Sequence, residues 1–504
     1  MAYEQYLDLY NTAPNRIINR SYKDSVFKIS FNDPDILADL EGIGLDISSL
    51  KYELKIIIGY GEEVAILKSP TGYFHVEQVL QDYTATDSQG YANTFGSHVM
   101  PQAEKDNVEY NNTPFSIHEI DKFSCNRTNL IQVRFLVGLS FYNTDQQTFY
   151  PATHRPPKNK EILSRYYYWN AVQQHKDTDR DVTEYQQYIL DGTTKKFLTN
   201  QSPDFKRKVR IQDYQTLAFF NGKFCESANQ GHGHNNSPCD NSLVYYMYCR
   251  LYHANGTLIA TGRIRNNEDN GGTYNPALNS PNLIPPNYNP WNRGLLYVGV
   301  GPNNIIDNWD NTAGGSITSA LFNNTARYEI FATGSGGLAQ IRSDIYHFEM
   351  QEGDCKDYEL IRLAYLNRQG AWDYMNFTKK STRTTDITRS NFKQNYGVVP
   401  LRYIPNNPVY NKWDYDSAMG GTRTYNVNAI ETIEANTDWL TEEDAIHLEE
   451  LFTSPDVYMQ NENNEFEPVV VTERDYTKQT KANDKLIQYV ISVQKGHETR
   501  VQRL

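Results

Sequence analysis

The densest group of side chains that could do chemistry is a loop of cysteines and histidines, FCESANQGHGHNNSPCD. Cys225, His232, His234 and Cys239 are the ligand types of a tetrahedral zinc site. Their spacings of six, one and four intervening residues match no zinc-finger pattern. A Gly/Asn-rich loop with incidental histidines, or a redox pair of the two cysteines, would explain the same letters. The four residues are candidate metal ligands, and we expect no obligate cofactor.

Motifs that would identify an enzyme are not found in the sequence. The Gly-rich segments VGVGPNN and ATGSGG complete neither a dinucleotide-binding fingerprint nor a phosphate-binding loop. No nucleophile elbow G-x-S-x-G and no zinc motif H-E-x-x-H occurs. Paired carboxylates for glycoside hydrolysis cannot be recognised from one sequence, because the two need only be close in space. The sequence therefore predicts a protein that is not an enzyme.

Aromatic side chains in polar surroundings are the next candidates for a functional role. Trp291, Trp309 and Trp413 lie among Asn, Asp and Pro residues, and Trp372 and Tyr374 follow a predicted turn. Exposed Trp and Tyr are common anchors of protein interfaces. The loop Asp307–Asn308–Trp309–Asp310 also resembles a sugar-binding loop. The same aromatic residues could instead cap the core of a β-sandwich.

Composition limits the classes of partner. The chain has 504 residues, with 48 basic and 61 acidic side chains and a formal net charge of −13, which disfavours nucleic-acid binding. No apolar run approaches the roughly 18 residues that a membrane-spanning helix needs, and the first residues lack a signal-peptide pattern. We therefore expect synthesis in a cytoplasm, without membrane insertion. Five cysteines are too few for a disulfide framework, whereas 38 tyrosines suit half-exposed strands and interfaces.

Hydrophobic alternation predicts a mainly β chain of tandem β-sandwich-like domains with long loops. We expect an N-terminal sandwich over residues 1–150, a second β domain over 151–352, and a C-terminal α+β domain over 353–504 that carries one short helix. Val26–Phe31, Val209–Phe220 and Asn129–Tyr142 are among the segments with a strand pattern.

Turn and cap signals predict several local structures. His253–Ala254–Asn255–Gly256 predicts a tight hairpin, and Gly370 predicts a turn between the strands ELIRLAYLN and WDYMNFT. Thr441 as N-cap and Pro455 as stop bracket one amphipathic helix. The loop Asn266–Gly294 and the polar tail His497–Leu504 are expected to reach onto neighbouring subunits.

The C-terminal block resembles a known group of proteins. The segments IRLAYLNRQGAWDYMNFTKKSTRTTDITRS, TDWLTEEDAIHLEELFTSPDVYM and PVVVTERDYTKQTKANDKLIQYVISVQ follow one another in an order similar to that in virion proteins of tailed bacteriophages. The similarity is to crAss-like and related phages of Bacteroidota, mainly over residues 353–504. No catalytic residue is implied by this resemblance.

The resemblance implies a structural subunit of the tail, baseplate or neck of a virion, synthesised in the cytoplasm of the host bacterium. Its expected partners are copies of itself in a ring-like homo-oligomer and other tail or neck proteins. A module that binds a glycan on the host surface is the alternative, and it predicts that Trp291 and Trp309 share one exposed groove. A polysaccharide hydrolase is the third hypothesis.

Overall fold

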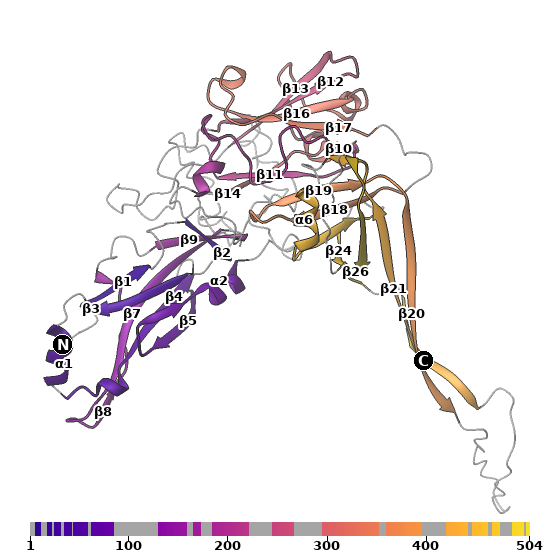
Figure 1. Cartoon of the computed structure of the whole chain (residues 1–504). Helices are drawn as coiled ribbons and strands as arrows, with labels where there is room; N and C mark the ends of the chain where they lie inside the picture. The colour runs from indigo at the N-terminus through magenta and orange to yellow at the C-terminus, as the bar shows by residue number, and fades with distance from the viewer. Residues whose placement is uncertain are drawn as a thin grey trace, which may run out of the picture. The chain divides into compact units, whose positions relative to one another are not determined.

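A computed structural model gives the fold of the chain (Figure 1). It describes residues 6–11, 18–22, 25–31, 35–42, 44–58, 62–84, 130–158, 165–172, 184–220, 244–266, 295–351, 359–394, 420–441, 446–461, 466–473, 486–497 and 500–503. The prediction of a mainly β chain with a short C-terminal helix is confirmed. Among the described residues, no helix is long and apolar enough to cross a membrane.

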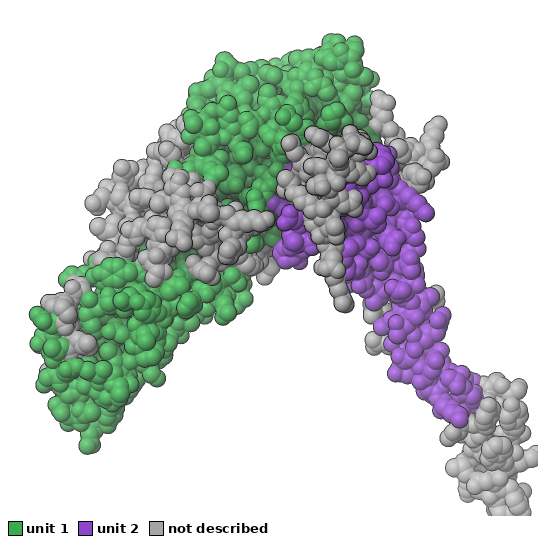
Figure 2. All heavy atoms as spheres, in the orientation of Figure 1, with its two compact units in different colours: residues 1–352, 365–374 green, residues 353–364, 375–504 purple. Residues whose placement is uncertain are grey.

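The chain divides into two compact units (Figure 2). Unit 1 comprises residues 1–352 and 365–374, and unit 2 comprises residues 353–364 and 375–504. Unit 1 contains two separate hydrophobic cores, one built from residues between Leu7 and Tyr168 and one from residues between Leu190 and Phe348. The first core continues past residue 150, because the strand Arg165–Val172 belongs to the first large sheet.

The first core of unit 1 lies between two sheets. The smaller sheet has the order β1-β3-β6 and the larger has the order β2-β9-β7-β4-β5, with β8 paired to β7. Their bounds are β1 Leu7–Asn11, β2 Ile18–Tyr22, β3 Val26–Phe31, β4 Lys51–Ile58, β5 Glu62–Ser69, β6 Tyr73–His75, β7 Leu130–Asn143, β8 Thr148–Tyr150 and β9 Arg165–Val172. Phe27 of β3 packs on Phe135 of β7, with ring centroids 4.5 Å apart. Alternating apolar residues thus give each sheet one buried face.

The second core of unit 1 joins a six-stranded sheet, in the order β10-β17-β16-β12-β13-β15, to the pair β11-β14. The bounds are β10 Arg207–Val209, β11 Thr216–Phe220, β12 Tyr246–Tyr252, β13 Leu258–Arg265, β14 Leu295–Gly299, β15 Asp310–Asn311, β16 Arg327–Thr333 and β17 Tyr346–Met350. The predicted hairpin at His253 is confirmed, with Gly256 N–H donating to the His253 carbonyl at 2.9 Å.

The segment predicted as one strand, Val209–Phe220, is two strands separated by a turn. Asp213 N–H donates to the Arg210 carbonyl, and the Asp213 carboxylate accepts from the Arg210 backbone N–H at 2.8 Å. The turn separates β10 from β11, and these strands lie in different sheets. The short turn at Asp213 therefore divides this apolar run between two sheets.

Unit 2 is built on a sheet of the order β19-β18-β23-β24-β26-β21-β20, with β27 also paired to β21. The bounds are β18 Ile361–Leu366, β19 Trp372–Phe377, β20 Ser381–Gln394, β21 Gly421–Asn436, β22 Leu440–Thr441, β23 Val457–Gln460, β24 Phe466–Val471, β25 Leu486–Ile487, β26 Val490–Lys495 and β27 Arg500–Arg503. The strands on both sides of Gly370 are confirmed, and β22 pairs with β25.

Helices are few and short. They are α1 Asp35–Gly42, α2 Glu77–Tyr83, α4 Pro302–Ile305, α5 Ser319–Phe322 and α6 Ile446–Thr453, with 3-10 turns at Ile47–Ser49, Glu184–Tyr188 and Gly337–Ala339. The predicted C-terminal helix is present as α6, and its Leu448 and Leu451 are fully buried. The tail predicted to reach onto neighbours instead forms β27, which pairs with β21 of the same chain.

The tip of the β18–β19 hairpin belongs to unit 1, although both strands continue into the sheet of unit 2. Gly370 turns this tip with a φ of +77°, and a Cβ there would lie 1.8 Å from the backbone oxygen of Asn170. Tyr297 donates a hydrogen bond to the Gly370 carbonyl at 2.6 Å, and Trp169 donates to the Gln369 carbonyl at 3.2 Å. Both the backbone conformation and the close approach require glycine.

Replacing Gly370 with alanine should therefore destabilise unit 1 by at least about 3 kcal/mol, since backbone atoms must move. The matched control is Gly256→Ala, where φ is +82° and nothing lies within 4 Å of the added Cβ. That control should lose only about 1–2 kcal/mol, the cost of the left-handed conformation. Urea unfolding of both variants measures the difference, and equal losses would contradict the proposed close packing.

Candidate functional site

The predicted zinc ligands Cys225, His232, His234 and Cys239 lie outside the described residues, as do Trp291 and Trp413. Within the described ranges, no group of three or more His, Cys, Asp or Glu residues could hold a metal ion. Cys249 is the one cysteine in those ranges, and it is fully buried in the second core. Burial raises the pKa of its thiol to about 12, so Cys249 is a packing residue rather than a reactive thiol.

Trp309 is a core residue and is not an exposed anchor. Its side chain is fully buried in the second core of unit 1. The backbone N–H of Trp309 donates to Ile305 at 3.0 Å, and its carbonyl accepts from Ile317 at 2.9 Å. Because the indole is enclosed by its own chain, it cannot line the exposed groove that the glycan-binding hypothesis requires.

Trp372 and Tyr374 are also buried, at 4% and 3% exposure. Because both side chains are buried within the single chain, the prediction that they anchor an interface with another subunit is wrong. Both lie at the start of β19, in the part of the hairpin that belongs to unit 1. The Tyr374 hydroxyl lies 3.3 Å from the Thr216 hydroxyl, and its carbonyl accepts from Gln201 at 3.4 Å. These aromatic residues stabilise the inserted hairpin.

Asp373, between these two aromatic residues, is the centre of a buried hydrogen-bond network. Its carboxylate accepts from the Thr199 hydroxyl at 2.7 Å and from the Asn367 side-chain amide at 2.9 Å. Burial raises the pKa of Asp373 to about 6, although the two hydrogen bonds and the positive charge of Arg207 oppose this increase. Asn367 also accepts from the backbone N–H groups of Gln369 and Ala371, each at 3.0 Å. One network therefore links the hairpin turn to the irregular segment around Thr199.

A serine hydroxyl, a histidine ring and a carboxylate meet on the first large sheet. Ser140 donates to the carboxylate of the buried Glu53 at 2.7 Å, and His154 Nε2 lies 3.2 Å from the other Glu53 oxygen. Lys68 Nζ lies 2.8 Å from the Glu53 oxygen that accepts from Ser140. Burial would raise the pKa of Glu53, but Lys68, Ser140 and His154 together lower it.

This cluster differs from a nucleophile–base arrangement. The Ser140 proton is directed at the carboxylate rather than at the imidazole, so histidine does not activate the hydroxyl. Burial also lowers the pKa of His154. The arrangement satisfies a buried carboxylate and supplies no activated nucleophile.

The hairpin β20–β21, which we name the arm, includes β20, a strand of 14 residues in which no residue is buried. Its strands pair from Ser381↔Ala435 to Gln394↔Gly421. On the other edge of β21, β26 covers only Thr432–Asn436 and β27 covers Asn426–Ala429. Of the strands that the structure describes, only β20 pairs with the remaining part of β21, and the two strands run on as a narrow ribbon (Figure 1).

Apolar side chains are exposed along the arm. Ile387 is 49% exposed, Phe392 is 39% exposed and Tyr425 is 50% exposed. The rings of Phe392 and Tyr425 pack at 6.3 Å between centroids. The register shifts by one residue at Tyr425, because Ser390 faces Asn426 and Asn391 faces Thr424. The bulge directs an extra aromatic side chain outward near the distal end of the arm.

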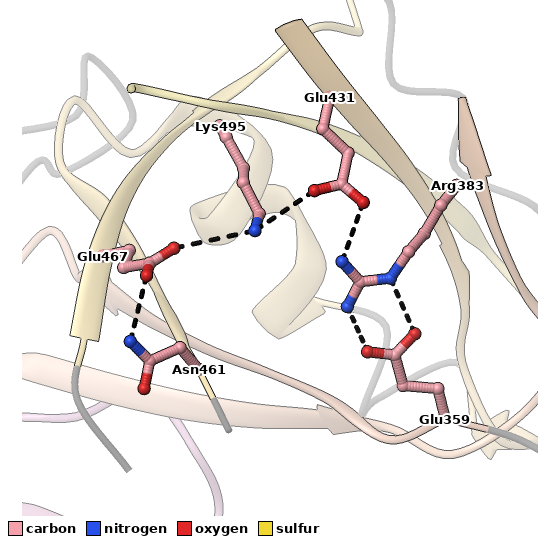
Figure 3. A network of polar contacts seen from close by, with 6 residues as sticks. All are labelled: Glu359, Arg383, Glu431, Asn461, Glu467 and Lys495. Carbon is pink, nitrogen blue, oxygen red and sulfur yellow. Dashed lines mark hydrogen bonds and ion pairs between the residues drawn. The ribbon is translucent and has the colours of Figure 1, made fainter. Parts of the chain in front are cut away.

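The base of the arm carries a ladder of alternating charges that crosses four strands (Figure 3). Its members are Arg383 on β20, Glu431 on β21, Lys495 on β26 and Glu467 on β24. Arg383 donates to Glu431 at 2.8 Å, Lys495 lies 3.1 Å from Glu431, and the distance from Lys495 to Glu467 is 3.8 Å. Glu359 binds the outer side of the Arg383 guanidinium through two hydrogen bonds.

The ladder crosses a partly buried face of the sheet. Glu431 lies on β21 between buried residues of the same face, with Ile433 and Ala435 on one side and Ala429 on the side towards the arm. Partial burial would raise the pKa of Glu431, but Arg383 and Lys495 lower it. The hydrogen bonds that Arg383 donates to Glu359 raise the pKa of Arg383. Each charge is thus held by an opposite one, and the network links the strands at the base of the arm.

Charged residues in strand-like runs could have indicated this site. Arg383, Glu431 and Lys495 are all charged residues within or beside such runs, which is unusual for a buried face. Their register across the strands was needed to see the ladder, and the sequence does not give register. Neither the ladder nor the network at Asp373 was predicted from the sequence.

Asp373→Asn should change how stability depends on pH. Because the folded pKa of Asp373 is above its ordinary value of 3.8, the folded state binds the proton more tightly. Wild-type stability should therefore fall as pH rises from about 4 to about 7, by about 3 kcal/mol for this group. The variant should lose that component, whereas Asp204→Asn, at an exposed position, should keep it. Urea unfolding at several pH values tests this, and identical pH profiles would contradict it.

Arg383→Glu should loosen the base of the arm, because the new carboxylate would face Glu359 and Glu431. We expect a loss of about 1 kcal/mol, the size typical of a partly exposed ion pair, and faster amide hydrogen exchange at residues 381–385. Arg389→Glu makes the same charge change on the same strand at an exposed position and serves as the control. Equal exchange rates in the two variants would contradict a stabilising role for the ladder.

Comparisons with known proteins give no family for this chain. No family model matches the sequence, and no curated protein matches it. Among solved structures, a Salmonella alpha-2-macroglobulin variant aligns with a TM-score of 0.15 and 7% sequence identity. The alignment covers 99% of this chain, which spans 34% of the length of that protein. A TM-score this low carries no argument about fold or function.

Proposed function

We propose that this protein is a structural subunit of a tailed-phage virion, part of the tail, baseplate or neck, that acts by protein–protein assembly. Its partners are copies of itself in a ring-like oligomer and neighbouring tail or neck proteins. The observation that carries the proposal is the arm, which exposes Ile387, Phe392 and Tyr425 on a narrow ribbon. Apolar and aromatic side chains displayed this way are typical of surfaces that become buried in an assembly.

Two further features support the proposal. The arm lies within residues 353–504, the region whose sequence resembles virion proteins of Bacteroidota phages. A two-stranded ribbon that buries few side chains is marginally stable alone, so a partner surface would add much of its stability.

The excess of acidic over basic residues, 61 against 48, argues against a role in packaging nucleic acid.

The proposal predicts that the purified full-length protein self-associates in a concentration-dependent manner. Electron microscopy should show rings or regular oligomers, and light scattering after size-exclusion chromatography should give their mass. The double variant Phe392→Ser/Tyr425→Ser should weaken association at least about tenfold, since aromatic anchors dominate interface energy. At a dilution where the wild type is monomeric, its thermal unfolding should match that of the wild type, because both side chains are exposed in the single chain.

Leu258→Ser is the matched control, because Leu258 is 49% exposed but lies on β13 of unit 1. It should leave assembly unchanged. A wild-type protein that stays monomeric, both alone and with extracts of phage-infected cells, would refute the proposal. Binding to host-surface glycan by that monomer would support the receptor-module alternative instead.

A further inference from the structure

The outer edge of the arm is a long strand without a described neighbour. β20 ends the sheet order, and no described strand other than β21 pairs with it. It runs from Ser381 to Gln394, about 45 Å at the ordinary rise of a strand. Natural proteins shorten such edges or interrupt them with proline or a bulge. β20 contains no proline, and the one bulge residue of the arm, Tyr425, lies on β21.

We propose that β20 forms an antiparallel pair with β20 of a second copy of this chain, with Ile387 facing Ile387 across a two-fold axis. This inference rests on the proposed function, because it names the partner of the arm. In an antiparallel pair, residues that lie opposite each other are on the same face of the sheet. When a two-fold axis relates the two strands, this requires that one residue lies opposite its own copy, at the axis. The candidates near the middle of β20 are Asp386, Ile387 and Thr388.

Charge selects among these three registers. An axis at Asp386 would place that carboxylate against its own copy and Arg383 against Arg389. An axis at Thr388 would place Arg383 against Lys393. Like charges that face each other directly across strands are destabilising. The axis at Ile387 avoids every such pair.

In the Ile387 register, each charged side chain faces a hydroxyl or an amide that can form a hydrogen bond with it. The facing pairs are Arg383 with Asn391, Thr385 with Arg389, Asp386 with Thr388 and Ser381 with Lys393. The pairing uses nearly the whole strand. It would also cover Ile387, an apolar side chain that is 49% exposed in the single chain.

The side chains of β20 agree with this partner. Thr382, Thr384, Thr385 and Thr388 are all exposed, and threonine is a residue type that favours β-strands. β26 and β27 cover parts of the other edge of β21, whereas no described strand covers any part of the outer edge of β20, which is therefore the longer free edge for strand addition. One such contact joins copies two at a time, so a ring would need a second interface.

Disulfide formation tests the register directly. Residues directly opposite in an antiparallel pair have Cα atoms about 4.5–5.5 Å apart, within the range that a disulfide spans. Ile387→Cys should therefore give a covalent dimer under mild oxidation of the full-length protein. Thr384→Cys, on the same strand and also exposed, should not, because its counterpart would be about 20 Å away. Wild type is oxidised in parallel, since the chain has five cysteines of its own.

A mixture of Asp386→Cys and Thr388→Cys provides a second check of the register. These positions face each other, so the mixture should cross-link at least several-fold more than either variant alone. Equal cross-linking at residues 384 and 387, or none at 387, would overturn the proposed pairing.

Ile387→Asp separates this inference from the proposed function, because it would place two carboxylates together on the axis. It should abolish the paired species in light scattering, while thermal unfolding stays unchanged at a dilution where the wild type is also monomeric. If wild type and Ile387→Asp assemble equally, the pairing is wrong and the proposed assembly role stands. If neither assembles alone or with phage proteins, the assembly role fails as well.

Discussion

The packing of the β18–β19 turn in unit 1 depends on the hydrogen bonds that the buried Asp373 carboxylate accepts. The carboxylate accepts hydrogen bonds from Thr199 and Asn367, and Asn367 in turn closes the Gly370 turn. A charged group so deeply buried is costly unless it is hydrogen-bonded, which is why the burial of Asp373 and the geometry of its donors must be maintained together. The neighbouring aromatic residues Trp372 and Tyr374 are held in place by the same hairpin.

Unit 2 meets a different physical requirement, that of holding a ribbon beyond the reach of a hydrophobic core. Cross-strand charge pairs around Glu431 join the strands at the base of this ribbon, and from Asn428 towards Gly421 no residue of β21 is buried. Partly exposed ion pairs are individually weak, but a ladder across four strands couples them. The arm is therefore fixed at its base, while its distal side chains, including Phe392 and Tyr425, are left for contacts with other molecules.

Local sequence patterns predicted the elements well and their partners poorly. The alternation of apolar and polar residues predicted β3, and the residue types predicted the turns at Gly370 and Gly256. The same reasoning joined β10 to β11, because a short aspartate turn inside an apolar run has a weak signal. It also left Trp309 as a candidate interface anchor as well as a core-capping residue, since polar neighbours in sequence do not show what encloses a side chain in space. Register and long-range burial produced both the charge ladder and the Asp373 network, and neither can be read from one sequence.

The hairpin tip has a consequence for how the chain is made. Residues 365–374 complete unit 1 although they follow residues that belong to unit 2. A ribosome that has released only residues 1–352 therefore exposes a unit whose Thr199, Trp169 and Tyr297 still await their hydrogen-bond acceptors. Unit 1 can reach its final packing only after the β18–β19 turn has emerged. Fragments cut at residue 352 would carry the same defect permanently, so an N-terminal piece that contains all of unit 1 extends at least to residue 374.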